Sequence, residues 1–181
     1  MQRQFFAFSL KAAYDFSMRA AATFDSSFRV HSVYLELVDY LLVDFDLFCT
    51  AAVEKEMGGR NPTSLRLRSL LANKSIQRAT ARSQKIKLYG DGERAAINLA
   101  LERELLLLID DWRPYEAARS AGVAVLNSAV YIVGLYQQHR IQFAKAVDAI
   151  SKLAKRGTLT PGWIQSALKV IANIRKEEAN L

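Results

Sequence analysis

The sequence predicts an α/β fold, a three-layer α/β/α sandwich with a parallel sheet of four or five strands and a helical C-terminus. The clearest signals lie in residues 88–128. Leu105–Ile109 is a run of five apolar residues, typical of a strand buried on both faces, and Val123–Leu126 is a second such strand. One helix is expected to start at Asp91 as its N-cap, and another to cover Trp112–Ser120. Strand, helix and strand with short joints imply that the strands run parallel.

The first half of the chain shows the same alternation of strands and helices. Ala20–Phe24 is expected to be the first strand, and Phe45–Thr50 the second. Between them, apolar residues recur at helical spacing over Phe28–Val43. Ala51–Met57 then predicts a further helix. Because helices separate the two strands and follow the second, both strands are expected to belong to the same parallel sheet.

The remainder of the chain is expected to be helical. Apolar residues predict helices over Ala129–Gln138 and Ile141–Leu153, and Thr160-Pro161 is a helix start with threonine as N-cap and proline in the first turn. We expect residues 20–178 to form a single domain and residues 1–19 to be an N-terminal extension of undefined role.

Composition narrows the class of protein. Of 181 residues, 51% are hydrophobic and 24% charged, which indicates a globular chain. No apolar run approaches the roughly 20 residues that span a membrane. The single cysteine, Cys49, excludes an internal disulfide and fits a reducing cytosol, so a cytoplasmic location is expected. The net charge of +7 favours an anionic partner such as nucleic acid, although an ordinary basic domain has the same balance.

The most basic stretch is residues 58–90, which contains no acidic residue. Its leucines suggest a helix, so the stretch is either a solvated helical face with a loop or a track for a phosphate backbone. No aromatic residue interleaves before Tyr89, so stacking of bases is not indicated. The nucleic-acid contacts expected on the second interpretation are Arg66, Arg68, Arg82 and Lys85.

Acidic residues stand at the predicted strand ends and helix starts. They are Asp25, Glu56, Glu93 or Asp91, and Asp110 or Asp111. Each has a simpler explanation as a helix cap or a surface charge. At one edge of a parallel sheet, however, they would repel one another unless a cation neutralised them, and Mg²⁺ or Mn²⁺ suits oxygen ligands. No glycine-rich phosphate loop competes, because Gly90-Asp91-Gly92 lacks the length and the lysine of one.

The chain resembles the PIN-domain nucleases, and within them the branch related to VapC-type toxins of prokaryotic toxin–antitoxin systems. The similarity extends from about Ala20 to Leu168. The residues that carry it are Asp25-Ser26-Ser27, Val53-Glu54-Lys55-Glu56, Gly92-Glu93-Arg94-Ala95-Ala96-Ile97, Leu107-Leu108-Ile109-Asp110-Asp111 and Ala117-Ala118-Arg119 with Gly122. The Gly-Glu-x-x-Ala-Ile and Ile-Asp-Asp elements are the most specific part.

This resemblance implies a Mg²⁺- or Mn²⁺-dependent endoribonuclease, with the toxin of a toxin–antitoxin pair as a candidate role. RNA and an antitoxin protein are the expected partners, and a homodimer the expected assembly. The implied ligands are Asp25, Glu56, Glu93 and Asp111, with Asp110 and Asp91 as further candidates for the metal site. Ser26 or Ser27 would support the metal-bound water or the phosphate, and Ser128 stands where relatives often carry a site hydroxyl.

Two other classes compete with the enzyme. One is a PIN-like module that has lost turnover and binds RNA or a protein. The other is a different nucleotide-binding α/β protein, which the missing phosphate loop disfavours. All four expected acidic positions are filled in this chain, which favours the enzyme.

Overall fold

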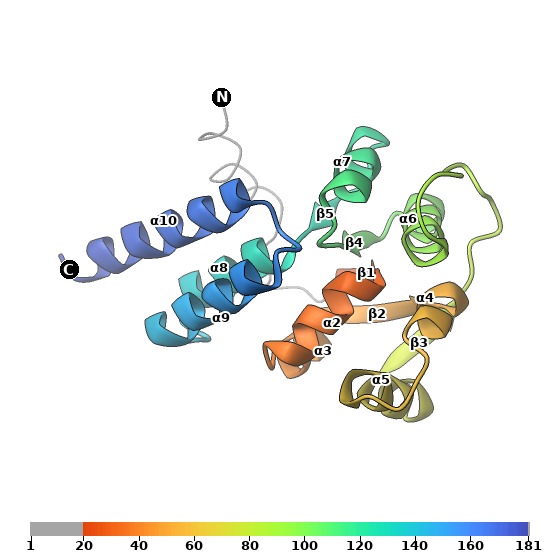
Figure 1. Ribbon diagram of the computed structural model, residues 1–181, viewed down its shortest axis with the longest axis horizontal. Coiled ribbons are helices and arrows are strands. Elements are labelled where there is room, and N and C mark those ends of the chain that lie inside the picture. The colour runs from red at the N-terminus through yellow and green to blue at the C-terminus, as the bar shows by residue number, and fades with distance from the viewer. Residues whose placement is uncertain (1–19, 181) are drawn as a thin grey trace. The chain divides into compact units, whose positions relative to one another are not determined.

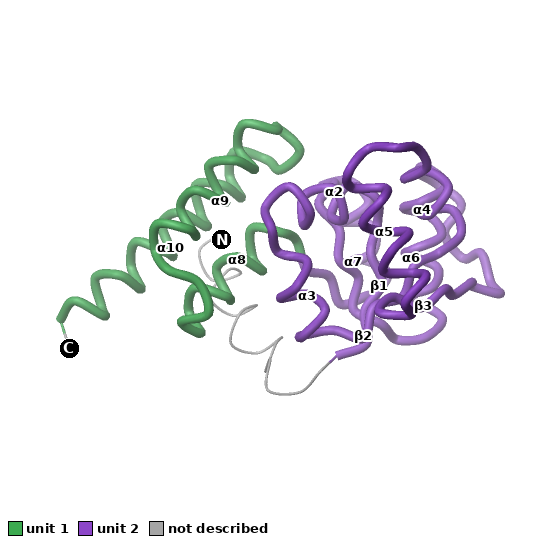
Figure 2. The backbone as a smooth tube through the Cα atoms, turned by 90° about the horizontal axis from the view of Figure 1, so that it is seen from below, with its two compact units in different colours: residues 1–17, 127–181 green, residues 18–126 purple. Residues whose placement is uncertain are grey.

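The computed structural model describes residues 20–180, so the predicted extension of residues 1–19 lies outside the described part. The described chain divides into two compact units, a sheet unit of residues 20–126 and a helical unit of residues 127–180 (Figure 2).

The sheet unit contains five parallel strands in the order β3-β2-β1-β4-β5 (Figure 1). They are β1 (Ala20–Phe24), β2 (Phe45–Thr50), β3 (Ile76–Ala79), β4 (Leu106–Leu108) and β5 (Val125–Leu126). The central pairs are in register at Ala22↔Leu47 and Ala22↔Leu106. All three residues of β4 are buried, as expected for a parallel strand covered on both faces. The predicted parallel α/β fold is therefore confirmed.

Helices cover both faces of this sheet. Helices α2 (Ser26–Tyr34), α3 (Val38–Asp44) and α5 (Pro62–Ala72) lie on one face, and α6 (Asp91–Arg103) and α7 (Trp112–Ser120) on the other (Figure 1). This is the arrangement expected when every crossover between parallel strands is right-handed. The short helix α4 (Ala51–Glu56) follows β2 and packs beside α6. Because the chain moves from β1 to β2 in one direction and from β4 to β5 in the other, β1 and β4 form the switch point of the sheet.

The structure corrects three details of the predicted elements. The helix expected over residues 28–43 is two helices, because Glu36 adopts a left-handed backbone with φ of 56° and the amide of Leu37 donates to Ser32 O at 2.8 Å. The basic stretch 58–90 contains strand β3 as well as a helix. The N-cap of α6 is Gly90, whose extended backbone starts the helix one residue before the predicted cap, Asp91.

The helical unit consists of α8 (Ser128–Gln137), α9 (Phe143–Arg156) and α10 (Pro161–Glu178), each of which packs against the other two. As predicted, α10 begins at Pro161 with Thr160 as its N-cap. Helix α9 buries Ala146, Ile150 and Leu153 along one stripe, the pattern of a helix with one face toward a core. None of the helices described is both long enough and apolar enough to traverse a lipid bilayer.

Candidate active site

Two acidic segments meet at the switch point of the sheet. Asp25 follows β1 directly, and Asp110 and Asp111 follow the neighbouring strand β4. The backbone amide of Asp25 donates to Leu108 O at 3.1 Å, which ties the two strand ends together. In open parallel sheets, ligands bind in the crevice outside the carboxyl ends of the strands, at such a switch point.

Asp25 is completely buried and caps helix α2. Its Oδ1 accepts the amide of Phe28 at 2.9 Å, and its Oδ2 accepts the amide of Ser27 at 3.2 Å and the Ser27 hydroxyl at 2.5 Å. Burial raises the pKa of Asp25 to about 7, and the charge of Asp110 adds to this rise, while the hydrogen bonds from Ser27 and Phe28 oppose it. Ser26, the first residue of α2, is half-buried. The helix-cap explanation of Asp25 is therefore correct, whatever further role it has.

Asp110 pairs with a residue that sequence analysis did not select. Its Oδ2 lies 2.5 Å from Nδ1 of His31 on α2, and both side chains are buried. His31 belongs to the buried stripe of α2, together with Phe28 and Ser32. A histidine on a buried stripe needs a polar partner, so this position was the available signal. Asp25, Asp110 and His31 form what we call the inner group.

Glu56 and Glu93 approach each other at the first turn of α6, where two glycines leave room for them. The amide of Gly92 donates to Glu56 Oε1 at 2.6 Å. A Cβ on Gly92 would lie only 2.8 Å from Glu56 Oε1. A Cβ on Gly90 would clash with Glu93 Oε2 and lie 3.8 Å from Glu56 Oε1. The Gly-Asp-Gly segment therefore forms a cradle that side chains at positions 90 and 92 would fill.

The charges of three carboxylates interact at this cradle. Burial raises the pKa of Glu93, and the charges of Glu56 and Asp111 raise it further. Asp111 is exposed, and its side chain caps α7 by accepting the amide of Arg113 at 3.2 Å. We call Glu56, Glu93 and Asp111 the outer group.

The neighbouring carboxylates are occupied elsewhere. Glu54, two residues before Glu56, forms two hydrogen bonds to the guanidinium of Arg78, at 2.8 and 2.9 Å. Asp91 is exposed and pairs with Arg94. Of the two glutamates on α4, only Glu56 therefore reaches the cradle.

The described carboxylates are the type of ligand that a divalent cation prefers, but their oxygen atoms do not converge on a single binding position. Within residues 20–180, no three His, Cys, Asp or Glu side chains are grouped closely enough to hold a metal ion. The fit lies in the outer group, where Gly90 and Gly92 leave room for the carboxylates of Glu56 and Glu93 and the charges of Glu56 and Asp111 act on Glu93. Hard oxygen ligands of this kind are what Mg²⁺ and Mn²⁺ prefer. Ser128 is buried at the start of α8 in the helical unit.

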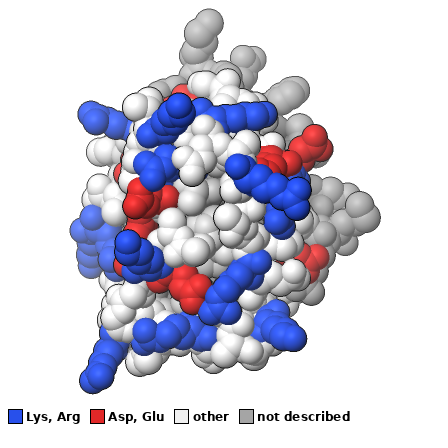
Figure 3. All heavy atoms as spheres, turned by 90° about the vertical axis from the view of Figure 1, so that its right-hand side faces the viewer, with Lys and Arg blue, Asp and Glu red and all other residues white. Residues whose placement is uncertain are grey.

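The four basic residues predicted to contact nucleic acid are exposed on the sheet unit. Arg66 pairs with Asp39 at 3.1 Å, and Arg68 donates to Gly59 O at 2.6 Å. Arg82 and Lys85 lie on the segment between β3 and α6. Figure 3 shows Lys and Arg side chains spread over the face that carries α4, α5 and α6, with Asp and Glu among them.

The raised pKa of Asp25 predicts that stability falls as pH rises. The folded pKa of about 7 lies above the ordinary value of 3.8, so between these values the folded chain binds more protons than the unfolded chain. The contribution of Asp25 to the free energy of unfolding is complete below about pH 4 and is lost as the pH rises through about 7. The total loss is on the order of a few kcal/mol. Urea unfolding in chelator at pH 5 and pH 8 measures it. The difference should shrink in Asp25→Asn and persist in Asp148→Asn on the surface of α9; equal differences in all three proteins would contradict it.

Comparison with known proteins gives one clear result. Residues 33–172 match a family model described as a PIN domain. The match includes Glu56, Glu93, Asp111 and Ser128 and begins after Asp25. A comparison with curated proteins found no match. Because the match spans well over half of the chain and agrees with the five-stranded parallel sheet, this chain belongs to the PIN-domain family.

Proposed function

We propose that this PIN-domain protein is a Mg²⁺- or Mn²⁺-dependent endoribonuclease that hydrolyses phosphodiester bonds of single-stranded RNA. Membership of the PIN family indicates nuclease-type activity on nucleic acid. The observation that carries the rest is the outer group, in which the charges of Glu56 and Asp111 raise the pKa of Glu93 beside a cradle of glycines. Carboxylates that repel one another at the carboxyl edge of a parallel sheet are what a divalent cation would stabilise.

In this proposal Glu56, Glu93 and Asp111 would hold the cation together with Asp25. A bound divalent ion would activate a water molecule and stabilise the leaving oxygen of the phosphodiester. The chain itself orients the ligands: the amide of Gly92 holds Glu56, and the hydroxyl of Ser27 holds Asp25. Ser26 is proposed as a supporting hydroxyl, with Asp110 and Asp91 as further candidate ligands.

The resemblance to VapC-type toxins supports a finer proposal, that the protein acts in the cytoplasm as the toxin of a toxin–antitoxin pair and forms a homodimer. An antitoxin could compete with RNA for the exposed arginines of the sheet unit, because basic surfaces also bind acidic peptide segments.

One observation favours a second candidate, a PIN-like binding module without turnover. Asp25 is completely buried, and both of its oxygens already accept hydrogen bonds within α2. The two functions separate in one experiment, incubation of labelled single-stranded RNA with the protein in Mn²⁺ and in chelator. The nuclease cleaves only with Mn²⁺, whereas the binding module retards the RNA without cleaving it.

The basic side chains should set the salt dependence of RNA binding. Replacing Arg66, Arg68, Arg82 and Lys85 together by glutamine should weaken binding, and should reduce the slope of log K against log salt by about 0.7 for each phosphate that is no longer neutralised. Fluorescence anisotropy over a series of salt concentrations measures this slope. An unchanged slope would show that these side chains form a solvated surface and do not contact RNA phosphates. Substituting four lysines or arginines of the helical unit in the same way is the control for net charge.

A further inference from the structure

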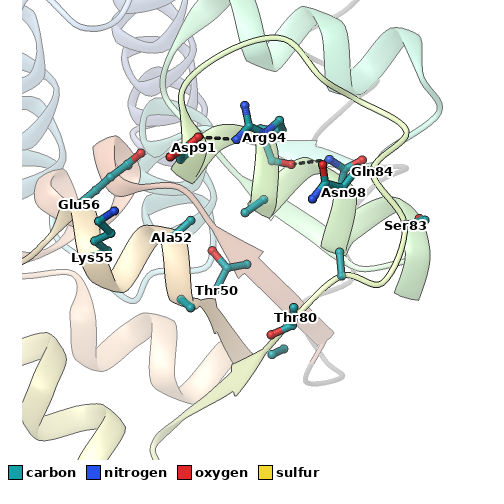
Figure 4. A pocket seen from close by; sticks show the side chains of 14 residues that line it. Thr50, Ala52, Lys55, Glu56, Thr80, Ser83, Gln84, Asp91, Arg94 and Asn98 are labelled. Carbon is teal, nitrogen blue, oxygen red and sulfur yellow. Dashed lines mark hydrogen bonds and ion pairs between the residues drawn. The ribbon is translucent and has the colours of Figure 1, made fainter.

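A groove of about 610 Å³ opens at the carboxyl ends of β2 and β3 (Figure 4). Helices α4 and α6 and the segment that joins β3 to α6 form its walls. Glu56 of the outer group lines it, whereas Asp25, Glu93 and Asp111 do not. The groove therefore begins at one side of the outer group and leads away from it over the sheet edge.

Hydrogen bonds to α6 hold one wall of the groove in place. The carboxylate of Glu102 accepts the amides of Arg82 and Ser83 at 2.6 and 2.9 Å. The side chain of Asn98 accepts the amide of Ile86 at 2.9 Å and donates to its carbonyl at 2.8 Å. The segment is thus fixed by α6 although it forms neither helix nor strand, so the groove is largely formed before a ligand enters.

The lining combines small apolar side chains with polar groups that have spare hydrogen-bonding capacity. Ala52 of α4 and Ala95 of α6 line the groove with small apolar side chains. Within residues 20–180, the side chains of Lys55, Ser83 and Gln84 make no hydrogen bond or ion pair. Figure 4 shows Lys55 and Gln84 on opposite sides of the groove.

We propose that this groove is the subsite for one nucleotide of the RNA strand, next to the bond that is cleaved. The inference rests on the proposed nuclease function, because the substrate of an endonuclease continues on both sides of the scissile phosphate. The volume lies within the range of about 300–1,000 Å³ typical of small-molecule sites. Lys55 contacts the phosphate, the alanines contact the base, and the amide of Gln84, both donor and acceptor, reads the edge of the base.

The test uses two groove variants of the full chain, each with a matched control. Gln84→Ala removes the base-reading amide, and Gln77→Ala at an exposed position of β3 is its control. Ala95→Leu fills the groove, and Ala154→Leu at an exposed position of α9 is its control. Anisotropy in chelator measures the binding of fluorescein-labelled random-sequence RNA, and sequencing of the ends produced in Mn²⁺ gives the base preference beside the cut. Circular dichroism verifies that each variant is folded.

We expect Gln84→Ala to weaken binding about threefold to tenfold and to flatten the base preference at one position beside the cut. Ala95→Leu should weaken binding about tenfold or more, while both controls match the wild type. Cleavage with unchanged affinity and preference in both groove variants would overturn the subsite and leave the nuclease standing. Groove-dependent binding without any cleavage would support a nucleotide site and overturn the nuclease. Absence of both RNA binding and cleavage by the wild type would overturn both.

Discussion

Asp25→Asn should abolish Mn²⁺-dependent cleavage of single-stranded RNA, lowering the rate by at least about a hundredfold. Asparagine keeps the shape of the side chain and an oxygen for the amide of Phe28, so the cap of α2 survives in part. It removes the negative charge that a divalent cation requires. Initial rates of cleavage with Mn²⁺, measured at equal protein concentration, give the effect.

Two further variants control this experiment. Asp148→Asn changes the net charge equally at an exposed position of α9, and it should cleave like the wild type. Asp91→Asn should lose much less activity than Asp25→Asn if Asp91 only pairs with Arg94 at the start of α6. Full activity in Asp25→Asn, or cleavage that persists in chelator, would remove the metal-dependent nuclease and leave the binding module as the better account.

Much of the fold was predictable because local pattern and burial agree in this chain. The bounds predicted for β2, Phe45–Thr50, are those observed, and Ala20–Phe24 and Trp112–Ser120 likewise match β1 and α7. Buried parallel strands are short apolar runs, and this signal survives without knowledge of their neighbours.

The elements that were missed lack such a local signal. Strand β3 has only two buried residues, Ile76 and Ala79, because it pairs with one neighbour at the edge of the sheet. The break between α2 and α3 depends on Glu36 in a left-handed conformation that usually favours glycine or asparagine. Tertiary packing overrides the helical spacing of the sequence at this point.

The candidate site divides in the same way. Sequence placed Asp25, Asp110 and Asp111 after strands, and the parallel sheet brings these strand ends together. Sequence could not find the partner of Asp110, because His31 lies 79 positions away. Nor could it find the groove, whose wall depends on Asn98 and Glu102 reaching backbone groups 12 to 20 positions earlier. Interactions of this kind leave no spacing pattern.

The inner group yields the largest expected effect on stability. His31→Ala should lower the free energy of unfolding by about 3 kcal/mol or more, because removing one partner of a buried hydrogen bond to a carboxylate leaves that group poorly satisfied. The side chains of His31 and Asp110 are 2% and 0% exposed, so water cannot replace the imidazole without opening the core. Urea unfolding in chelator at pH 7 measures the loss. His31→Gln, which keeps an amide donor on α2, should recover part of it.

The double variant separates this pair from the simple loss of a buried ring. If the 2.5 Å hydrogen bond is what stabilises the inner group, Asp110→Asn should be less harmful in the His31→Ala background than in the wild type, because the carboxylate no longer has this partner. The coupling free energy between the two substitutions should then be about 1–3 kcal/mol. Losses that simply add would show that His31 acts only by filling space. Since the charge of Asp110 also raises the pKa of Asp25, a true coupling would mean that a histidine on α2 helps to set the electrostatics at the switch point of the sheet.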